Sequence, residues 1–302
     1  GTRGSPLALT QTRLVIDQLS KSQADLSLRV EYVTTGGDRD QRTPLAVLGG
    51  RGIFVKEIES ALLAGEIDLA VHSLKDLPTV QPPGLTIGAV LAREDPRDAL
   101  VSRLGLPLER LPRGARVGTG SLRRQAQLRA FRPDLQVVDL RGNVDTRLRK
   151  AASEEYDAVV LALAGLIRLG REGEVTEVLP LEVMLPAVGQ GAVCVEVRSD
   201  DADVLALVCP LDDPKTRAAV TAERSFLREL GGGCHVPIAA HGVMGGEELC
   251  LRGLVARVTG GRVERGSLSG PPEAAEELGR RLAHHLLQRG CRELLAEEVQ
   301  HG

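Results

Sequence analysis

The residue pattern most suited to chemistry is a pair of arginines at the start of a predicted helix. In Gly118-Thr-Gly-Ser-Leu-Arg-Arg-Gln125 a strand ends at Gly118, and a helix begins near Ser121, a favourable N-cap residue. Arg123 and Arg124 occupy the first turn, where the helix dipole disfavours each cation by about 0.3–1 kcal/mol. Free backbone N–H groups and two guanidinium groups at one helix end predict anion binding. Side chains that simply point into solvent are the alternative.

A second turn of the same kind follows at Arg141-Gly-Asn-Val-Asp-Thr-Arg147, with Asn143 as the expected N-cap. Residues 113–150 hold nine arginines and one lysine against three aspartates. Two such turns place four arginines at one edge of a predicted sheet, with Arg168 as a fifth and Arg3 facing them. Converging guanidinium forks indicate a ligand with several carboxylates.

An acid beside this basic region is Asp76, in Val71-His-Ser-Leu-Lys-Asp-Leu-Pro78. A strand runs directly into this polar turn, and an acid there can protonate a leaving group or stabilise a cation. Forming the turn is the simpler role for such an aspartate. His72 and Ser73 do not indicate a catalytic triad, because no G-x-S-x-G elbow accompanies them.

A thiol in a glycine-rich setting is the third chemical feature. In Gly231-Gly-Gly-Cys-His-Val-Pro237 the glycines allow close backbone approach and leave Cys234 accessible. This setting indicates a reactive or derivatised thiol, although a buried small hydrophobe remains the ordinary role of a cysteine. Neighbouring side chains on an extended chain point to opposite faces, so His235 is not expected to activate it.

Composition excludes several classes of function. The 302 residues include 2% aromatic side chains, no Trp, and a net charge of −3. Base stacking on single-stranded nucleic acid needs aromatic platforms, and duplex or membrane binding needs a basic field. No apolar run approaches the length that spans a bilayer. The five cysteines are widely spaced and suggest neither a disulfide framework nor a metal site. We therefore expect a cytoplasmic protein without metal, nucleic-acid or membrane partners.

The elements that position these residues fall into three blocks. In the first, a helix over 54–64 is bracketed by strands, which predicts a βαβ unit in a largely parallel sheet. The second repeats the pattern, and the third is an α+β unit. The predicted strands are 28–34, 67–71, 85–91, 115–118, 135–140, 157–164, 192–197, 237–243, 249–258 and 262–268, and the other helices are 121–131, 143–152, 214–230 and 273–288.

These blocks predict an α/β protein of three domains. The first covers 1–92 plus 190–210, because the strand 192–197 is expected to return to the first sheet; it holds Asp76. The second covers 97–186 and holds the arginines. The third covers 214–302 and holds Cys234. A cleft between the first two domains is expected to bind the ligand at the carboxyl ends of their strands.

Taken together, these segments resemble the porphobilinogen deaminase (hydroxymethylbilane synthase) family along nearly the whole chain. The similar strings are Thr2-Arg-Gly-Ser-Pro-Leu-Ala8, Gly52-Ile-Phe-Val-Lys-Glu57, His72-Ser-Leu-Lys-Asp-Leu-Pro78, Arg93-Glu-Asp-Pro-Arg-Asp98, Gly118-Thr-Gly-Ser-Leu-Arg-Arg124, Leu140-Arg-Gly-Asn143, Ala187-Val-Gly-Gln-Gly-Ala192 and Gly232-Gly-Cys-His-Val-Pro237. The resemblance implies a transferase of tetrapyrrole (haem) biosynthesis that joins four porphobilinogen molecules head to tail and releases ammonia. It also implies a monomer that passes hydroxymethylbilane to uroporphyrinogen III synthase.

The resemblance further implies a dipyrromethane cofactor, bound to Cys234 as a thioether, and Asp76 as the catalytic acid that assists ammonia loss and stabilises cationic azafulvene intermediates. The expected cofactor-binding residues are Ser73, Lys75, Asp76, Thr119, Ser121, Arg123, Arg124 and Arg147. The expected substrate-binding residues are Arg3, Ser5, Gln11, Phe54, Arg141, Arg147, Arg168 and Gln190. The first two domains are expected to resemble type II periplasmic binding proteins, with 36–52 as a mobile lid.

Three positions depart from the family pattern, namely Arg51, Gly120 and Asp145. Asp145 puts a negative charge among the arginines, where it either steers Arg147 or weakens binding of the growing chain. The rival interpretation is a two-domain anion-binding protein that performs no chemistry. That interpretation explains the arginines but not a glycine-flanked cysteine on a third domain.

Overall fold

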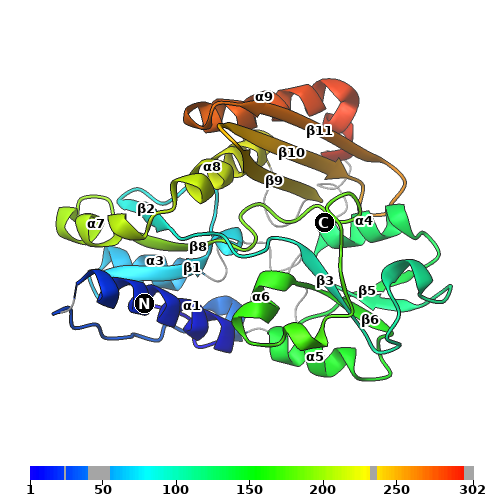
Figure 1. Ribbon diagram of the computed structural model, residues 1–302, viewed down its shortest axis with the longest axis horizontal. Coiled ribbons are helices and arrows are strands. Elements are labelled where there is room, and N and C mark those ends of the chain that lie inside the picture. The colour runs from blue at the N-terminus through cyan, green and yellow to red at the C-terminus, as the bar shows by residue number, and fades with distance from the viewer. Residues whose placement is uncertain (24, 40–54, 232–236, 296–302) are drawn as a thin grey trace.

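The computed structural model describes residues 1–23, 25–39, 55–231 and 237–295, which form three β-sheets with helices packed around them (Figure 1). The predicted α/β class is confirmed. Short one-turn or irregular helical segments connect the larger elements; they are α2 (Gly36–Arg39), η1 (Leu74–Asp76), η2 (Leu108–Arg110), η3 (Glu172–Glu174), η4 (Cys209–Leu211), η5 (Pro272–Ala274) and η6 (Leu287–Cys291). None of the helices in the described ranges is long and apolar enough to cross a membrane.

The first sheet has the order β1-β8-β2, with β1 at Leu69–Ser73, β8 at Val193–Arg198 and β2 at Leu85–Val90. As predicted, β8 returns to this sheet from far along the chain. It pairs antiparallel with both neighbours, so the prediction of a largely parallel sheet is wrong here. The reason is that β8 lies between β1 and β2, which are parallel to each other but do not pair.

Three helices pack against this first sheet: α1 (Pro6–Ser22), α3 (Lys56–Leu63) and α7 (Ala202–Val208). Helix α1 is not among the predicted helices, although its start carries clear signals. Ser5 is the N-cap, its hydroxyl accepts from the Ala8 N–H at 3.3 Å, and Pro6 occupies the first helical position. The predicted strand over 28–34 is reduced to a single bridge between Tyr32 and Thr2.

The second sheet has the order β5-β4-β6-β3-β7. Its strands are β3 (Asp98–Ser102), β4 (Arg116–Gly118), β5 (Gln136–Val138), β6 (Ala158–Ala162) and β7 (Glu177–Val178). The β4 strand is parallel to β5 and β6, whereas β3 is antiparallel to β6 and β7. Helices α4 (Leu122–Phe131), α5 (Val144–Ala151) and α6 (Leu163–Arg168) follow β4, β5 and β6. All three therefore begin at the carboxyl edge of the parallel strands, the usual location of a ligand.

The third sheet is antiparallel, with the order β11-β10-β9: β9 is Ile238–Gly245, β10 is Glu248–Ala256 and β11 is Val263–Gly270. Helices α8 (Pro214–Glu229) and α9 (Ala275–Leu286) pack on it around the fully buried Phe226, as the predicted α+β unit requires. A Cβ at Gly253 would lie 2.6 Å from the Phe226 ring, so only glycine fits under it. Figure 1 shows this unit above the other two.

Candidate functional site

A cavity of about 500 Å³ opens between the start of α1 and the start of α5. One wall carries Arg3 and Ser5 with Ser73, Lys75 and Asp76, and the facing wall carries residues of the turn before α5 and its first turns, among them Arg141 and Arg147. A smaller cavity of about 70 Å³ shares Ser73, Lys75 and Arg147 with it and adds Gln11, Arg124 and Arg168. The two form one cleft, which has the expected place between the first and second sheets.

Asp76 reaches the cleft because β1 ends at Ser73 and the chain turns at once into η1. The turn is held by the Leu77 N–H, which donates to the Leu74 carbonyl at 3.2 Å. Ser73 is anchored to α1, since Gln11 Nε2 donates to its hydroxyl at 2.9 Å. The sequence therefore places Asp76 by strand and turn, and the contact with Gln11 of α1 fixes the turn against the first helix.

The charged form of the Lys75 amine is destabilised by its surroundings. Burial lowers the pKa of its amine to about 8, and the positive charges of Arg124 and Arg147 act in the same direction, against the attraction of Asp76 and Asp98. An anionic ligand in the cleft would raise this pKa again, because a nearby negative charge favours the protonated amine.

Arg141 and Arg147 have buried nitrogens without hydrogen-bond partners among the described residues. These atoms are Arg141 Nη1 and Arg147 Nε. Burial lowers the pKa of Arg147 to about 10, with the charge of Arg124 adding to the effect. Buried donors are normally paired, and an unmade bond costs about 1–3 kcal/mol. Carboxylates of a bound ligand would supply the missing acceptors.

The remaining residues of the expected substrate set lie as follows. Arg3 and Ser5 line the larger cavity, although the Ser5 hydroxyl is also the N-cap of α1. Arg168, at the end of α6, lines the smaller cavity and donates from Nη2 to the Gly191 carbonyl at 2.7 Å. Its pKa is lowered by burial. The structure therefore brings the four arginines of the expected substrate-binding set to one cleft: Arg3, Arg141, Arg147 and Arg168.

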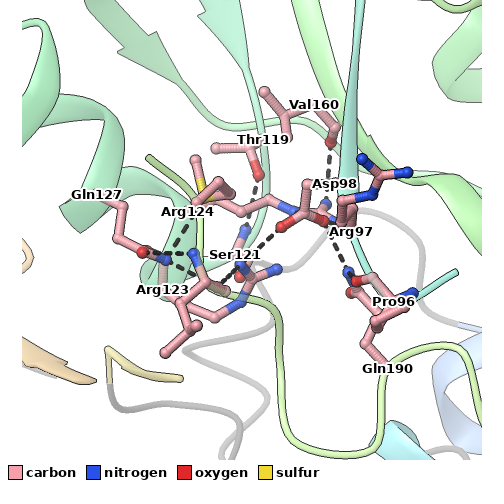
Figure 2. A network of polar contacts seen from close by, with 12 residues as sticks. Pro96, Arg97, Asp98, Thr119, Ser121, Arg123, Arg124, Gln127, Val160 and Gln190 are labelled. Carbon is pink, nitrogen blue, oxygen red and sulfur yellow. Dashed lines mark hydrogen bonds and ion pairs between the residues drawn. The ribbon is translucent and has the colours of Figure 1, made fainter. Parts of the chain in front are cut away.

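Arg123 and Arg124 bind an anion that the chain itself supplies (Figure 2). Arg123 Nη1 lies 2.7 Å from Asp98 Oδ2, and Arg124 Nη2 lies 2.7 Å from Asp98 Oδ1. Asp98 is fully buried. Burial alone would raise its pKa, but the charges of the two arginines and their hydrogen bonds outweigh that effect and hold the pKa well below the usual range. Neither arginine points into solvent, contrary to the alternative considered above.

The two arginines differ in what else they contact. Arg123 Nη1 also donates to the Leu185 carbonyl at 2.6 Å, and Arg123 is not among the residues that line the cleft. Arg124 donates to the Val160 carbonyl at 2.9 Å and does line the smaller cavity. Arg124 thus lies at the cleft, while Arg123 ties α4 to the segment before β8.

Three other expected residues surround this network rather than line the cleft. Gln190 Nε2 donates to Asp98 Oδ1 at 2.9 Å and to the Pro96 carbonyl at 2.8 Å (Figure 2). Thr119 is buried and its hydroxyl accepts from the Ser121 N–H at 3.3 Å. Ser121 is the N-cap of α4, as predicted, but its side chain makes no capping bond.

The departures from the family pattern have local explanations. A Cβ at Gly120 would lie 2.8 Å from the Leu140 carbonyl, so glycine suits the close approach of the two turns. Asp145 accepts from Arg171 Nη1 at 2.9 Å, which gives its charge a partner other than Arg147. Arg51, Phe54, Cys234 and most of the predicted lid lie outside the described residues.

Asp98 is not among the predicted site residues, although it directly precedes the apolar run Ala99-Leu-Val101. Asp98 opens a strand whose next residues, Ala99 and Leu100, are fully buried. A carboxylate at the start of a buried strand requires partners of opposite charge. Its partners, Arg123 and Arg124, are on a different element, so the pairing could not be predicted from local sequence.

Two models of one protein family match nearly the whole chain. The model described as porphobilinogen deaminase, dipyromethane cofactor binding domain, matches residues 1–206. The model described as porphobilinogen deaminase, C-terminal domain, matches residues 217–288. The unpaired buried nitrogens of Arg141 and Arg147 fit such a cofactor, since each of its pyrrole rings carries two carboxylates.

Relatives of the same name are similar along their whole length. Porphobilinogen deaminase of Roseiflexus sp. (strain RS-1) is 54% identical over 98% of this chain and 97% of its own. That of Syntrophus aciditrophicus (strain SB) is 51% identical over 100% and 98%. Among solved structures, a TRAP periplasmic solute binding protein from Pseudomonas putida F1 has a TM-score of 0.38 and 11% identity, over 75% of this chain and 78% of that chain. The chain belongs to the porphobilinogen deaminase family, and it is therefore a transferase that uses a dipyrromethane cofactor to join four porphobilinogen molecules, with loss of ammonia, into hydroxymethylbilane.

Proposed function

We propose that the cleft between the first two sheets is the place of this reaction, with Asp76 as its catalytic acid. The observation that carries the proposal is the arrangement around Asp76: one carboxylate shares a cavity of about 500 Å³ with Arg3, Arg141 and Arg147. The arginines bind carboxylates of the substrate and growing chain. Asp76 protonates the departing amine and stabilises the positive charge that the pyrrole develops.

The residues of the chain divide this work between them. The Arg141 and Arg147 side chains orient the ligand by charge. A bimolecular step thereby becomes effectively unimolecular. The dipyrromethane cofactor supplies the nucleophilic pyrrole carbon to which the first substrate is joined. Lys75 and Ser73 lie on the same wall as Asp76 and are assigned to the cofactor, as are Arg124 and Arg147. Gln11 acts by holding Ser73.

Other expected site residues are assigned supporting roles. Arg123, Thr119, Ser121 and Gln190 surround Asp98 or the turn before α4, so we assign them to holding Arg124 and that turn in place. Arg168 and Ser5 are retained as substrate-binding residues at the two ends of the cleft. Cofactor attachment at Cys234 and ring contact by Phe54 remain proposals that rest on the resemblance.

We also propose the three domains bounded as in the sequence analysis, at 1–92 plus 190–210, 97–186 and 214–302. The three separate sheets and the return of β8 to the first sheet support these limits. A cytoplasmic monomer that passes its product to uroporphyrinogen III synthase is the corresponding cellular proposal. Sedimentation at working concentration tests the monomer.

The acid role is tested by Asp76→Asn with Asp145→Asn as the matched control. Asp145 also lies near the cleft, on α5, but its carboxylate pairs with Arg171. We expect Asp76→Asn to keep the mass of the bound cofactor and lose nearly all porphobilinogen consumption, by about 10²–10⁴-fold. Asp145→Asn should stay within a few-fold of the parent rate. A normal rate in Asp76→Asn with cofactor bound would remove Asp76 from the chemistry.

A further inference from the structure

A separate cavity of about 160 Å³ lies behind the segment that carries Asp76. Its walls come from that segment, from β2 and from α8, and they include Leu74, Arg217, Thr221, Arg224 and Arg228. The volume exceeds the roughly 10–15 Å³ that one ordered water requires. Since Leu74 lines this cavity and Lys75 and Asp76 line the cleft, the two spaces contact opposite sides of one short turn.

The three arginines of this cavity are not equally neutralised. Arg217 Nη2 lies 2.7 Å from Asp212 Oδ1, and Arg228 forms an ion pair with Glu276. Arg224 donates only to neutral oxygens: Pro78 O at 2.6 Å, Leu77 O at 3.3 Å and Gln81 Oε1 at 3.3 Å. Among the residues that the structure describes, no carboxylate forms an ion pair with Arg224.

The environment of Arg224 favours a negative partner. Removal from water is the largest influence on its guanidinium and lowers its pKa. Cys194 and Glu196 act in the opposite direction, and the like charges of Arg228 and Arg217 add to the lowering. A desolvated charge is normally compensated by an opposite one. Thr221 lies three residues before Arg224 on α8, hence on the same face of the helix, and adds a hydroxyl to the cavity wall.

We propose that this cavity is a binding site for a small oxyanion of the size and charge of inorganic phosphate, held by Arg224 with the Thr221 hydroxyl. Arg228, paired with Glu276 of the cavity wall, stands at the more exposed end, with its side chain 43% accessible. The site is distinct from the cleft and opposite to it across Leu74. Arg224 also donates to the Leu77 and Pro78 carbonyls, which follow Asp76. The Arg224 guanidinium would therefore contact both the bound anion and the turn that carries Asp76.

Binding is tested on the cofactor-loaded protein by calorimetric titration with inorganic phosphate, at an ionic strength held constant with chloride. We expect one saturable site. Arg224→Gln should weaken phosphate binding about tenfold or more, the loss expected for a charge-assisted hydrogen bond. Thr221→Val keeps the shape of the side chain and leaves the bonds of Arg224 to the turn intact. It should weaken binding several-fold, which keeps the test valid if Arg224→Gln does not fold.

The control is Arg141→Gln, because the arginines of the cleft are the competing location for a bound phosphate. We expect this variant to bind phosphate as the parent does. Loss of binding in Arg141→Gln together with unchanged binding in Thr221→Val would place the anion in the cleft and overturn the proposal. Absence of saturable binding to the parent protein would overturn it as well.

Discussion

Arg93 and Glu223 join the segments that connect the first two sheets to the third unit. Arg93 Nη1 lies 2.5 Å from Glu223 Oε1, and Arg93 Nε donates to the Gln190 carbonyl at 2.8 Å. The same carboxylate accepts from the Gly189 N–H at 2.7 Å and from the Gly242 N–H at 2.7 Å. Glu223 of α8 thus binds both segments that connect the first two sheets, and also strand β9.

Because Glu223 is buried and has three partners, Glu223→Gln should lower the stability of the folded chain strongly. The substitution leaves Arg93 without its charge partner, and breaking a buried ion pair costs about 3–5 kcal/mol. Chemical denaturation should show that loss of unfolding free energy. Glu174→Gln removes one partner of an exposed pair with Arg171 and should cost at most about 1 kcal/mol. Equal losses of unfolding free energy in the two variants would contradict a special contribution of Glu223.

Asp98→Asn tests the internal anion. It leaves the buried Arg123 and Arg124 without an ionised partner, so we expect about 3–5 kcal/mol of destabilisation. The pKa of Asp98 is lowered in the folded chain, so its contribution is complete above the unfolded value of about 3.9 and is lost as the pH falls below it. The variant should therefore lose part of the acid dependence of unfolding. Asp95→Asn, which alters a more accessible pair with Arg97, is the control.

The pKa of Lys75 predicts stability in alkaline solution. In the folded chain it is lowered to about 8, against about 10.4 for an unfolded lysine. Between these values the unfolded chain binds more protons, so the free energy of unfolding should rise with pH, by about 1–3 kcal/mol for a partly accessible group. Cofactor-free Cys234→Ser protein should show this slope, and adding Lys75→Met should abolish it. Adding Lys21→Met, at an exposed lysine, should leave it unchanged.

Arg147 should contribute to binding of the substrate and growing chain, because its buried Nε has no acceptor within the described chain. We expect Arg147→Gln to lower kcat/KM for porphobilinogen by about 10–100-fold, the value of one charge-assisted hydrogen bond. Arg147→Lys should remain impaired, since an ammonium cannot reproduce the planar fork. Arg149→Gln alters an exposed arginine of the same helix and should be nearly silent. An unimpaired Arg147→Gln would contradict the assignment.

Much of the cleft was readable from local sequence. Asn143 caps α5 through its Oδ1, which accepts from the Thr146 N–H at 2.9 Å, and this cap sets where Arg141 and Arg147 stand. Asp76 follows a buried strand and a turn, as predicted. Such features depend on bonds between residues a few positions apart, so the order of residue types is sufficient to predict them. The missed helix α1 carried equally local signals in Ser5 and Pro6.

The partners of Arg123 and Arg124 were decided by tertiary structure alone. Their position in the first turn of a helix indicated an anion correctly, but Asp98 lies 25 residues before Arg123, on strand β3. The local sequence cannot distinguish a carboxylate of the chain from one of a ligand, because either can accept from the same guanidinium groups. The order of the strands determined that the acceptor is Asp98, because it brings the start of β3 into contact with the start of α4. The sequence by itself determined that this helix end binds negative charge, and only the packing of the sheet determined whose charge it is.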